Sequence, residues 1–108
     1  MIDTHCHIDL YPNPNKILKD LIKNNTTILS MTNLPSHFEM GVPYFSSLKK
    51  IRVALGMHPL MALHHKTEFN LFIKNFNKTS YIGEVGLDFS SEGISTKEIQ
   101  LETFSKIL

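Results

Sequence analysis

Short apolar runs and helix-length amphipathic stretches alternate along the chain. The apolar runs have the length and composition of buried strands and lie at residues 1–9, 26–32, 51–56 and 81–85. After each run, apolar residues recur at helical spacing. The first of these stretches covers residues 14–24, the second follows residue 36 and ends at about residue 49, the third begins at residue 67, and the fourth begins at residue 96. Four strands alternating with four helices predict an α/β fold with a parallel sheet, which is either an open doubly wound sheet or a (β/α) barrel.

Capping and helix-breaking residues predict where the helices begin and end. Asn13 and Pro14 are typical of a helix start, and Pro43 is expected to kink or split the second helix. Thr67 is expected to cap the third helix, and residues 95–98 read as a capping box for the fourth. The side chains expected to be buried on the first and third helices are Ile17, Leu18, Leu21, Ile22, Phe69, Phe72, Ile73 and Phe76.

Composition narrows the class of protein. A chain of 108 residues suits one small domain, and its net charge of +1 gives no global basic field, so nucleic-acid binding would depend on local chemistry. A single cysteine excludes an internal disulfide and indicates a reducing compartment. No apolar run could span a bilayer and no signal peptide precedes the first strand, so we expect a cytoplasmic protein with no membrane partner.

The first strand carries most of the candidate chemistry. Side chains alternate between the two faces of a strand, which places Asp3, His5, His7 and Asp9 together, opposite a mainly apolar face. Burying so many polar groups is costly unless each has a partner, and a divalent cation suits imidazoles and carboxylates alike. The pattern predicts a metal-binding strand, with Asp3 and Asp9 orienting the imidazoles. The alternative is a surface strand with incidental histidines.

Other strands also end in polar residues: His58 follows the third, Glu84 lies in the fourth, and Asp88 comes just beyond it. Because functional sites of parallel α/β folds form at the carboxyl ends of strands, these groups are expected to converge with His5 and His7. Two imidazoles and Glu84 form a ligand set for a hydrolytic cation, and the carboxylate could bridge two cations and take part in catalysis.

Each of these assignments has a simpler alternative. Glu84 could instead pair with Arg52. His58 could contact substrate or merely close the turn before the next residue, a proline, and Asp88 could position water or merely cap a loop. The histidines expected to be solvated are His37, His64 and His65.

Three segments in a fixed order are informative together: residues 3–9, 55–59 and 82–88, with Gln100 and Phe104 in the helix that follows. They resemble the TatD family of metal-dependent deoxyribonucleases, within the amidohydrolase superfamily. Residues 10–14 and 30–35 resemble most the TatD-like component of the Qat anti-phage defence system. The resemblance implies a TIM-type barrel with metal ligands at His5 and His7 and a bridging ligand at Glu84.

The resemblance also implies two further histidines and a late aspartate, which do not occur in these 108 residues. A complete barrel needs about 250 residues. We therefore expect residues 1–108 to form one partial domain, the N-terminal half of a TIM-type (β/α) barrel, and not the C-terminal half. A truncated gene product, an expression fragment and a half completed by another chain all remain open.

Three functions are compatible with this pattern. The first is a metal-dependent phosphodiesterase that acts on DNA with one or two Mg²⁺, Mn²⁺ or Zn²⁺ ions, in anti-phage defence. The second is a non-catalytic half-barrel or a subunit of a defence complex with protein partners. The third is a metal-dependent hydrolase of a small amide or ester.

Overall fold

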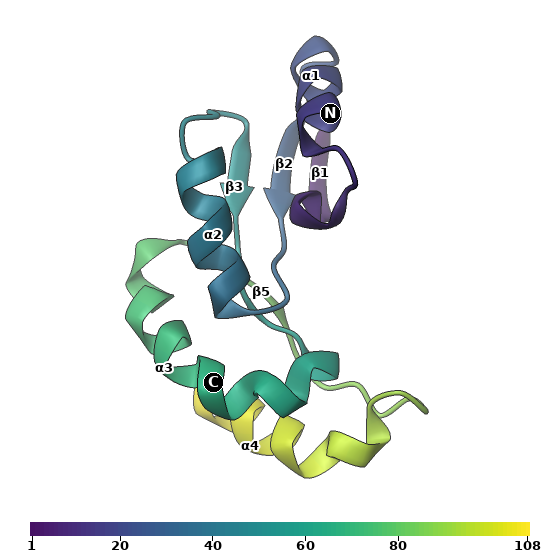
Figure 1. Cartoon of the computed structure of the whole chain (residues 1–108), viewed down its shortest axis with the longest axis vertical. Coiled ribbons are helices and arrows are strands. Elements are labelled where there is room, and N and C mark those ends of the chain that lie inside the picture. The colour runs from purple at the N-terminus through teal and green to yellow at the C-terminus, as the bar shows by residue number, and fades with distance from the viewer.

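Parallel strands alternate with helices throughout the computed structural model, which describes all 108 residues (Figure 1). The strands are β1 (Ile2–Cys6), β2 (Thr27–Ser30), β3 (Ile51–Val53), β4 (Leu55–Met57) and β5 (Ile82–Val85). The α-helices are α1 (Pro14–Lys23), α2 (Pro35–Phe45), α3 (Ala62–Asn75) and α4 (Lys97–Ile107). Single 3-10 turns are η1 (Ile8–Leu10), η2 (Pro59–Met61), η3 (Phe76–Lys78) and η4 (Ile94–Thr96). The predicted α/β class is confirmed, and the arrangement is consistent with part of a TIM-type barrel.

The strands form two parallel sheets that are joined at one point. β1, β2 and β3 pair in that order, and β4 pairs with β5. Ala54 separates β3 from β4, so the predicted third strand passes from one sheet into the other. Just beyond β2, Thr32 donates its N–H to the carbonyl of Gly83 at 3.3 Å and accepts from the N–H of Glu84 at 3.1 Å. These bonds hold the end of β2 against β5.

The core lies where α2 and α3 cover β4. It consists of the buried side chains Leu34, Phe38, Leu55, Met57 and Phe72. Each fully buried side chain of this size contributes about 1.5–3 kcal/mol to folding. A smaller cluster of Ile8, Phe45 and Ile51 joins η1, α2 and β3. α4 lies beside α3 (Figure 1). The core therefore fixes β4 and β5, whose ends carry His58 and Glu84.

Several helix predictions are corrected by the structure. α1 begins as expected, because the Asn13 side chain accepts from the N–H of Lys16 at 3.1 Å. α2 continues through Pro43 without a break, since the helix ends two residues later and the proline disturbs only its last turn. α3 begins at Ala62, so Thr67 lies inside the helix and donates its hydroxyl to a carbonyl of the preceding turn.

The predicted buried stripes are correct only in part. Phe72 is buried, but Ile73 and Phe76 are exposed. Neighbouring residues in a helix do not face the same way, so Ile73 cannot share the face of Phe72. Ile22 is also exposed. At the start of α4, the expected capping box is absent: Thr96 is the N-cap residue, and its side chain makes no capping hydrogen bond.

No helix of the structure combines the length and the apolar composition that a transmembrane span requires.

Candidate metal centre

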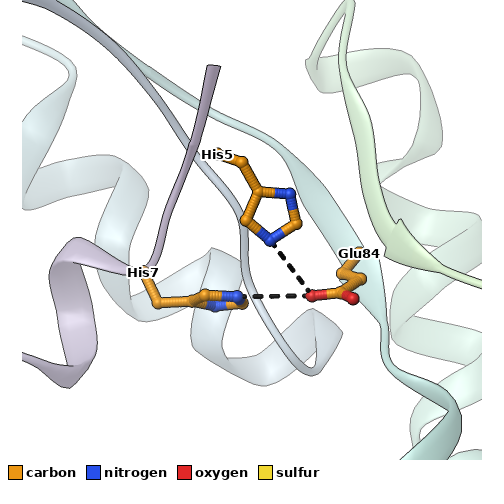
Figure 2. Close-up of side chains that lie close together, drawn as sticks. All are labelled: His5, His7 and Glu84. Carbon is orange, nitrogen blue, oxygen red and sulfur yellow. Dashed lines mark ion pairs between the residues drawn. The ribbon is translucent and has the colours of Figure 1, made fainter. Parts of the chain in front are cut away.

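Three side chains from the first and last strands of the chain meet at one point (Figure 2). Nε2 of His5 lies 3.4 Å, and Nε2 of His7 3.3 Å, from Oε2 of Glu84. His5 is in β1, and His7 comes directly after the last residue of that strand and before η1; both rings turn toward Glu84. One ligand atom from each of the three residues lies within 4.8 Å of the other two. The structure thus brings the predicted ligands together, while their role in binding metal stays a prediction.

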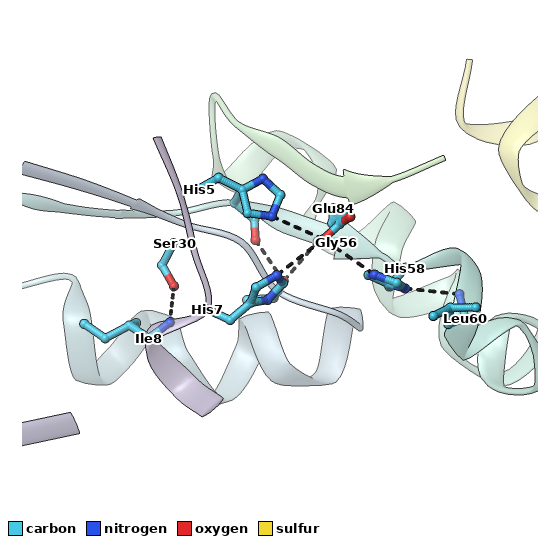
Figure 3. Close-up of polar contacts among 10 residues, drawn as sticks. His5, His7, Ile8, Ser30, Gly56, His58, Leu60 and Glu84 are labelled. Carbon is cyan, nitrogen blue, oxygen red and sulfur yellow. Dashed lines mark hydrogen bonds and ion pairs between the residues drawn. The ribbon is translucent and has the colours of Figure 1, made fainter. Parts of the chain in front are cut away.

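His58 joins this cluster from the turn after β4 (Figure 3). Its Nε2 lies 3.5 Å from the same Oε2 of Glu84, and its Nδ1 accepts the N–H of Leu60 at 3.1 Å. A neutral imidazole has one protonated nitrogen, so this hydrogen bond assigns the proton to Nε2, which points at Glu84. An Nε2–H group donates and cannot bind a cation. His58 therefore closes the turn, as one alternative proposed, and also contacts the carboxylate.

Close backbone packing places Glu84. A Cβ built at Gly56 would lie 1.5 Å from the carbonyl oxygen of Thr32 and 3.0 Å from the amide nitrogen of Glu84. Only glycine leaves room for the backbone that follows β2 to reach β5 at this point. Gly56 is thus required for the two backbone hydrogen bonds that Thr32 makes, one with the carbonyl of Gly83 and one with the N–H of Glu84.

The donor set fits a divalent cation. Imidazole nitrogens and a carboxylate oxygen are the ligands of Zn²⁺ in hydrolytic sites, and carboxylates also suit Mg²⁺ and Mn²⁺. The side chains of His7 and Glu84 are 22% and 33% exposed, so the site is partly shielded but open on one side. Arg52 does not neutralise Glu84, because its Nη1 donates to the backbone carbonyls of Lys49 and Ile51, each at 3.0 Å. The alternative ion pair is wrong.

The prediction that Asp3 and Asp9 orient the imidazoles is not matched by the structure. Oδ1 of Asp3 accepts from the backbone N–H of His5 at 3.0 Å and not from a ring. β1 ends at Cys6, so Asp9 falls in η1 and leaves the strand alternation on which the prediction depended. Oδ1 of Asp9 and Nδ1 of His7 are both buried without a hydrogen-bond partner.

Asp88 caps the loop after β5. Its Oδ1 accepts the N–H of Ser90 at 2.8 Å. Hydrogen bonds from Ser90 lower the pKa of the Asp88 carboxyl group below its ordinary value. The loop-cap alternative is therefore the better description of this residue.

Two polar residues that support the site were not predicted to do so. His65 was expected to be solvated, but it is 2% exposed, and burial is the main cause that lowers its pKa. Its burial was not predicted because the third helix was expected to begin only at Thr67. With α3 beginning at Ala62, His65 lies on the same buried stripe of the helix as Ala62 and Phe72. Gln100 is fully buried in α4 and was noticed only through the family resemblance. No apolar periodicity marked it in the sequence, because its neighbour on the buried face of α4, Thr103, is also polar.

The fold and the site define an α/β protein with a candidate metal centre at the carboxyl ends of its parallel strands. Comparison with known proteins places it more narrowly. A family model described as TatD related DNase matches residues 2–108, and the chain belongs to this family.

A curated relative supports this placement. It is described as an uncharacterized metal-dependent hydrolase of Buchnera aphidicola subsp. Baizongia pistaciae, strain Bp. It is 30% identical over 99 residues, which cover 82% of this chain and 37% of the relative. The chain therefore spans little more than a third of the length of the curated relative that it matches. The expected family is confirmed, and the narrower resemblance to the Qat component stays a prediction.

Proposed function

We propose that the chain carries the first metal-binding residues of a metal-dependent hydrolase that cleaves phosphodiester bonds in DNA. The observation that carries the proposal is the convergence of His5 and His7 on Glu84, with both Nε2 atoms 3.3–3.4 Å from one carboxylate oxygen. The description of the family supports DNA as substrate, and that of the relative supports metal dependence.

In this proposal His5 and His7 hold a divalent cation through Nε2, and Glu84 holds it through its carboxylate. The cation, Mg²⁺, Mn²⁺ or Zn²⁺, supplies Lewis acidity and a more acidic water. Since Glu84 has two oxygens, it could also bridge to a second cation. His58 donates its Nε2–H toward Glu84 or, with substrate bound, toward a phosphate oxygen.

The whole protein would need ligands beyond these three. A hydrolytic site with two imidazoles and one carboxylate can hold one cation, and a second cation requires more donors. We propose that residues outside the 108, in a longer chain or in a partner chain, supply them, because the chain covers only 37% of its relative. Action in the cytoplasm and in anti-phage defence belongs to the same proposal and depends on the resemblance of residues 10–14 and 30–35.

The test measures release of nucleotides from single- and double-stranded DNA after treatment with a chelator and addition of one metal at a time. A small ester and a small amide are assayed in parallel, to separate a nuclease from an amidohydrolase. We expect metal-dependent release from DNA that is lost in His7→Ala and Glu84→Gln and retained in His64→Ala, whose side chain is exposed.

The 108-residue chain is expected to be less active than a full-length relative. No turnover of DNA with any metal, by either the chain or the complete protein that contains it, would favour the non-catalytic alternative. Cleavage of the ester or amide alone would favour the third.

A further inference from the structure

His58 is held at every polar atom. Its backbone N–H donates to the carbonyl of Asn33 at 2.8 Å, and its ring Nδ1 accepts from Leu60 at 3.1 Å. Its own carbonyl accepts the N–H of Met61 at 2.9 Å and also lies 2.9 Å from Nε2 of His65. The remaining atom, Nε2, points toward Glu84, with Leu60 on the opposite side of the ring (Figure 3). These contacts fix both the backbone of His58 and the orientation of its ring.

The contact between His65 and His58 determines which nitrogen of His65 is protonated. A carbonyl oxygen only accepts, so Nε2 of His65 must be the donor. Nδ1 of His65 is then an unprotonated acceptor, and it is buried without a partner. An unpartnered buried acceptor costs free energy that an apolar side chain of similar size would avoid. The hydrogen bond to His58 is thus the interaction that distinguishes an imidazole from a leucine at this position.

We propose that His65 is a positioning residue for the metal centre: its Nε2–H is a second donor to the carbonyl of His58, beside the N–H of Met61, and ties the turn of η2 to α3 so that His58 presents Nε2–H to Glu84. His58 then acts as a donor to the carboxylate and not as a ligand. The Glu84 oxygen is kept next to the rings of His5 and His7. The inference rests on the proposed function, in which Glu84 binds a cation.

A purely structural role for His65 would predict different behaviour. If the ring only filled space at the start of α3, an apolar residue of similar size would replace it without effect on His58. If the hydrogen bond positions His58, only a side chain that places an N–H donor near the carbonyl of His58 can replace His65. His65→Leu removes the donor, and His65→Gln keeps an N–H group near the position of Nε2. His64→Leu is the matched control, because His64 is the preceding residue and is exposed.

Two readouts apply to these variants. Long-range ¹H–¹⁵N correlation spectra at about pH 8, where histidine is largely neutral, report which ring nitrogen of each histidine is protonated. Calorimetric titration with Mn²⁺ reports the affinity of the metal centre. In the wild type we expect both His58 and His65 to be protonated on Nε2. His65→Leu is expected to average the two tautomers of His58 and to weaken Mn²⁺ binding about 10-fold. His65→Gln restores both properties, and His64→Leu changes neither.

Two results would overturn the inference. The first is a wild-type His58 protonated on Nδ1. The second is a folded His65→Leu variant with the tautomer of His58 and the Mn²⁺ affinity unchanged. If His65→Leu does not fold, the wild-type spectrum and His65→Gln decide: a wild-type tautomer of His58 in His65→Gln supports the inference, and an averaged one opposes it. A wild type that binds no Mn²⁺ would contradict the proposed function, while the spectra would still test the role of His65.

Discussion

The side-chain amide of Gln100 is hydrogen-bonded to both backbone groups of Asp88. The N–H of Asp88 donates to Oε1 at 2.8 Å, and Nε2 donates to the carbonyl of Asp88 at 3.0 Å. The same Nε2 donates to the carbonyl of Gly93 at 2.8 Å. Because Gln100 is fully buried in α4, it ties the loop that follows Glu84 to a packed helix.

Replacing this amide should therefore destabilise the loop after β5. Gln100→Leu keeps the side chain buried but removes the partners of the N–H and the carbonyl of Asp88, whereas the carbonyl of Gly93 still accepts the N–H of Thr96 at 3.0 Å. Unsatisfied buried groups cost about 1–3 kcal/mol each, so for two groups we expect a loss of about 2–6 kcal/mol in the free energy of unfolding, measured in urea. Glu98→Gln, exposed on the same helix, should stay within about 0.5 kcal/mol of the wild type. A comparably small loss in Gln100→Leu would contradict this account of the loop.

Two glycines give a paired test of the packing beside Glu84. Gly56→Ala would place a Cβ 1.5 Å from the carbonyl oxygen of Thr32, so the strands must separate. Overpacking costs about 1–3 kcal/mol or more, and we expect a loss at the upper end together with weaker metal binding. At Gly41, in α2, the nearest atoms to a new Cβ belong to Phe45, at 3.6 Å.

Gly41→Ala is accordingly expected to stabilise the chain by about 1 kcal/mol, through helix propensity. Thermal unfolding of both variants makes the comparison. Equal effects of the two substitutions would show that the contact between the end of β2 and β5 is looser than described.

The burial of His65 predicts how stability changes with pH. Burial lowers the pKa of His65 in the folded state, and it outweighs the hydrogen bond to the carbonyl of His58, which acts to raise that pKa. Below about pH 6.5, the ordinary pKa of histidine, His65 is therefore protonated in the unfolded chain while it stays neutral in the folded chain. The free energy of unfolding should fall as the pH is lowered through this range.

His65→Gln cannot take up that proton, so its stability should depend less steeply on pH between about 7.5 and 5.5 than that of the wild type. Urea unfolding at several pH values measures both slopes. Identical slopes would mean that His65 is as accessible to protons in the folded chain as in the unfolded one.

The strands and the three converging side chains could be predicted because they depend on strand periodicity and on one general rule for parallel sheets. The alternation of His5 and His7 follows from strand geometry, and the position of Glu84 follows from the parallel order of the strands. Neither prediction needed the exact ends of helices. The α/β class and the cap at Asn13 were predicted for the same reason.

The supporting residues could not be predicted in this way because their roles depend on tertiary packing. Thr67 is a good cap in isolation, but the turn of η2, held by His58, makes Met61 the N-cap of α3, six residues before Thr67. That shift hid the burial of His65. The role proposed for Asp9 failed because the chain turns into η1 immediately after the strand. No local pattern reports which backbone groups a buried glutamine such as Gln100 will meet.

The central claim is that His5, His7 and Glu84 bind one divalent cation together. Calorimetric titration of the metal-free chain with Mn²⁺ and with Zn²⁺ tests it most directly, with His64→Ala as the control. We predict saturable binding that is weakened at least 10-fold by each of His5→Ala, His7→Ala and Glu84→Gln, and unchanged by His64→Ala. Binding of equal affinity in the wild type, His7→Ala and Glu84→Gln would contradict the claim.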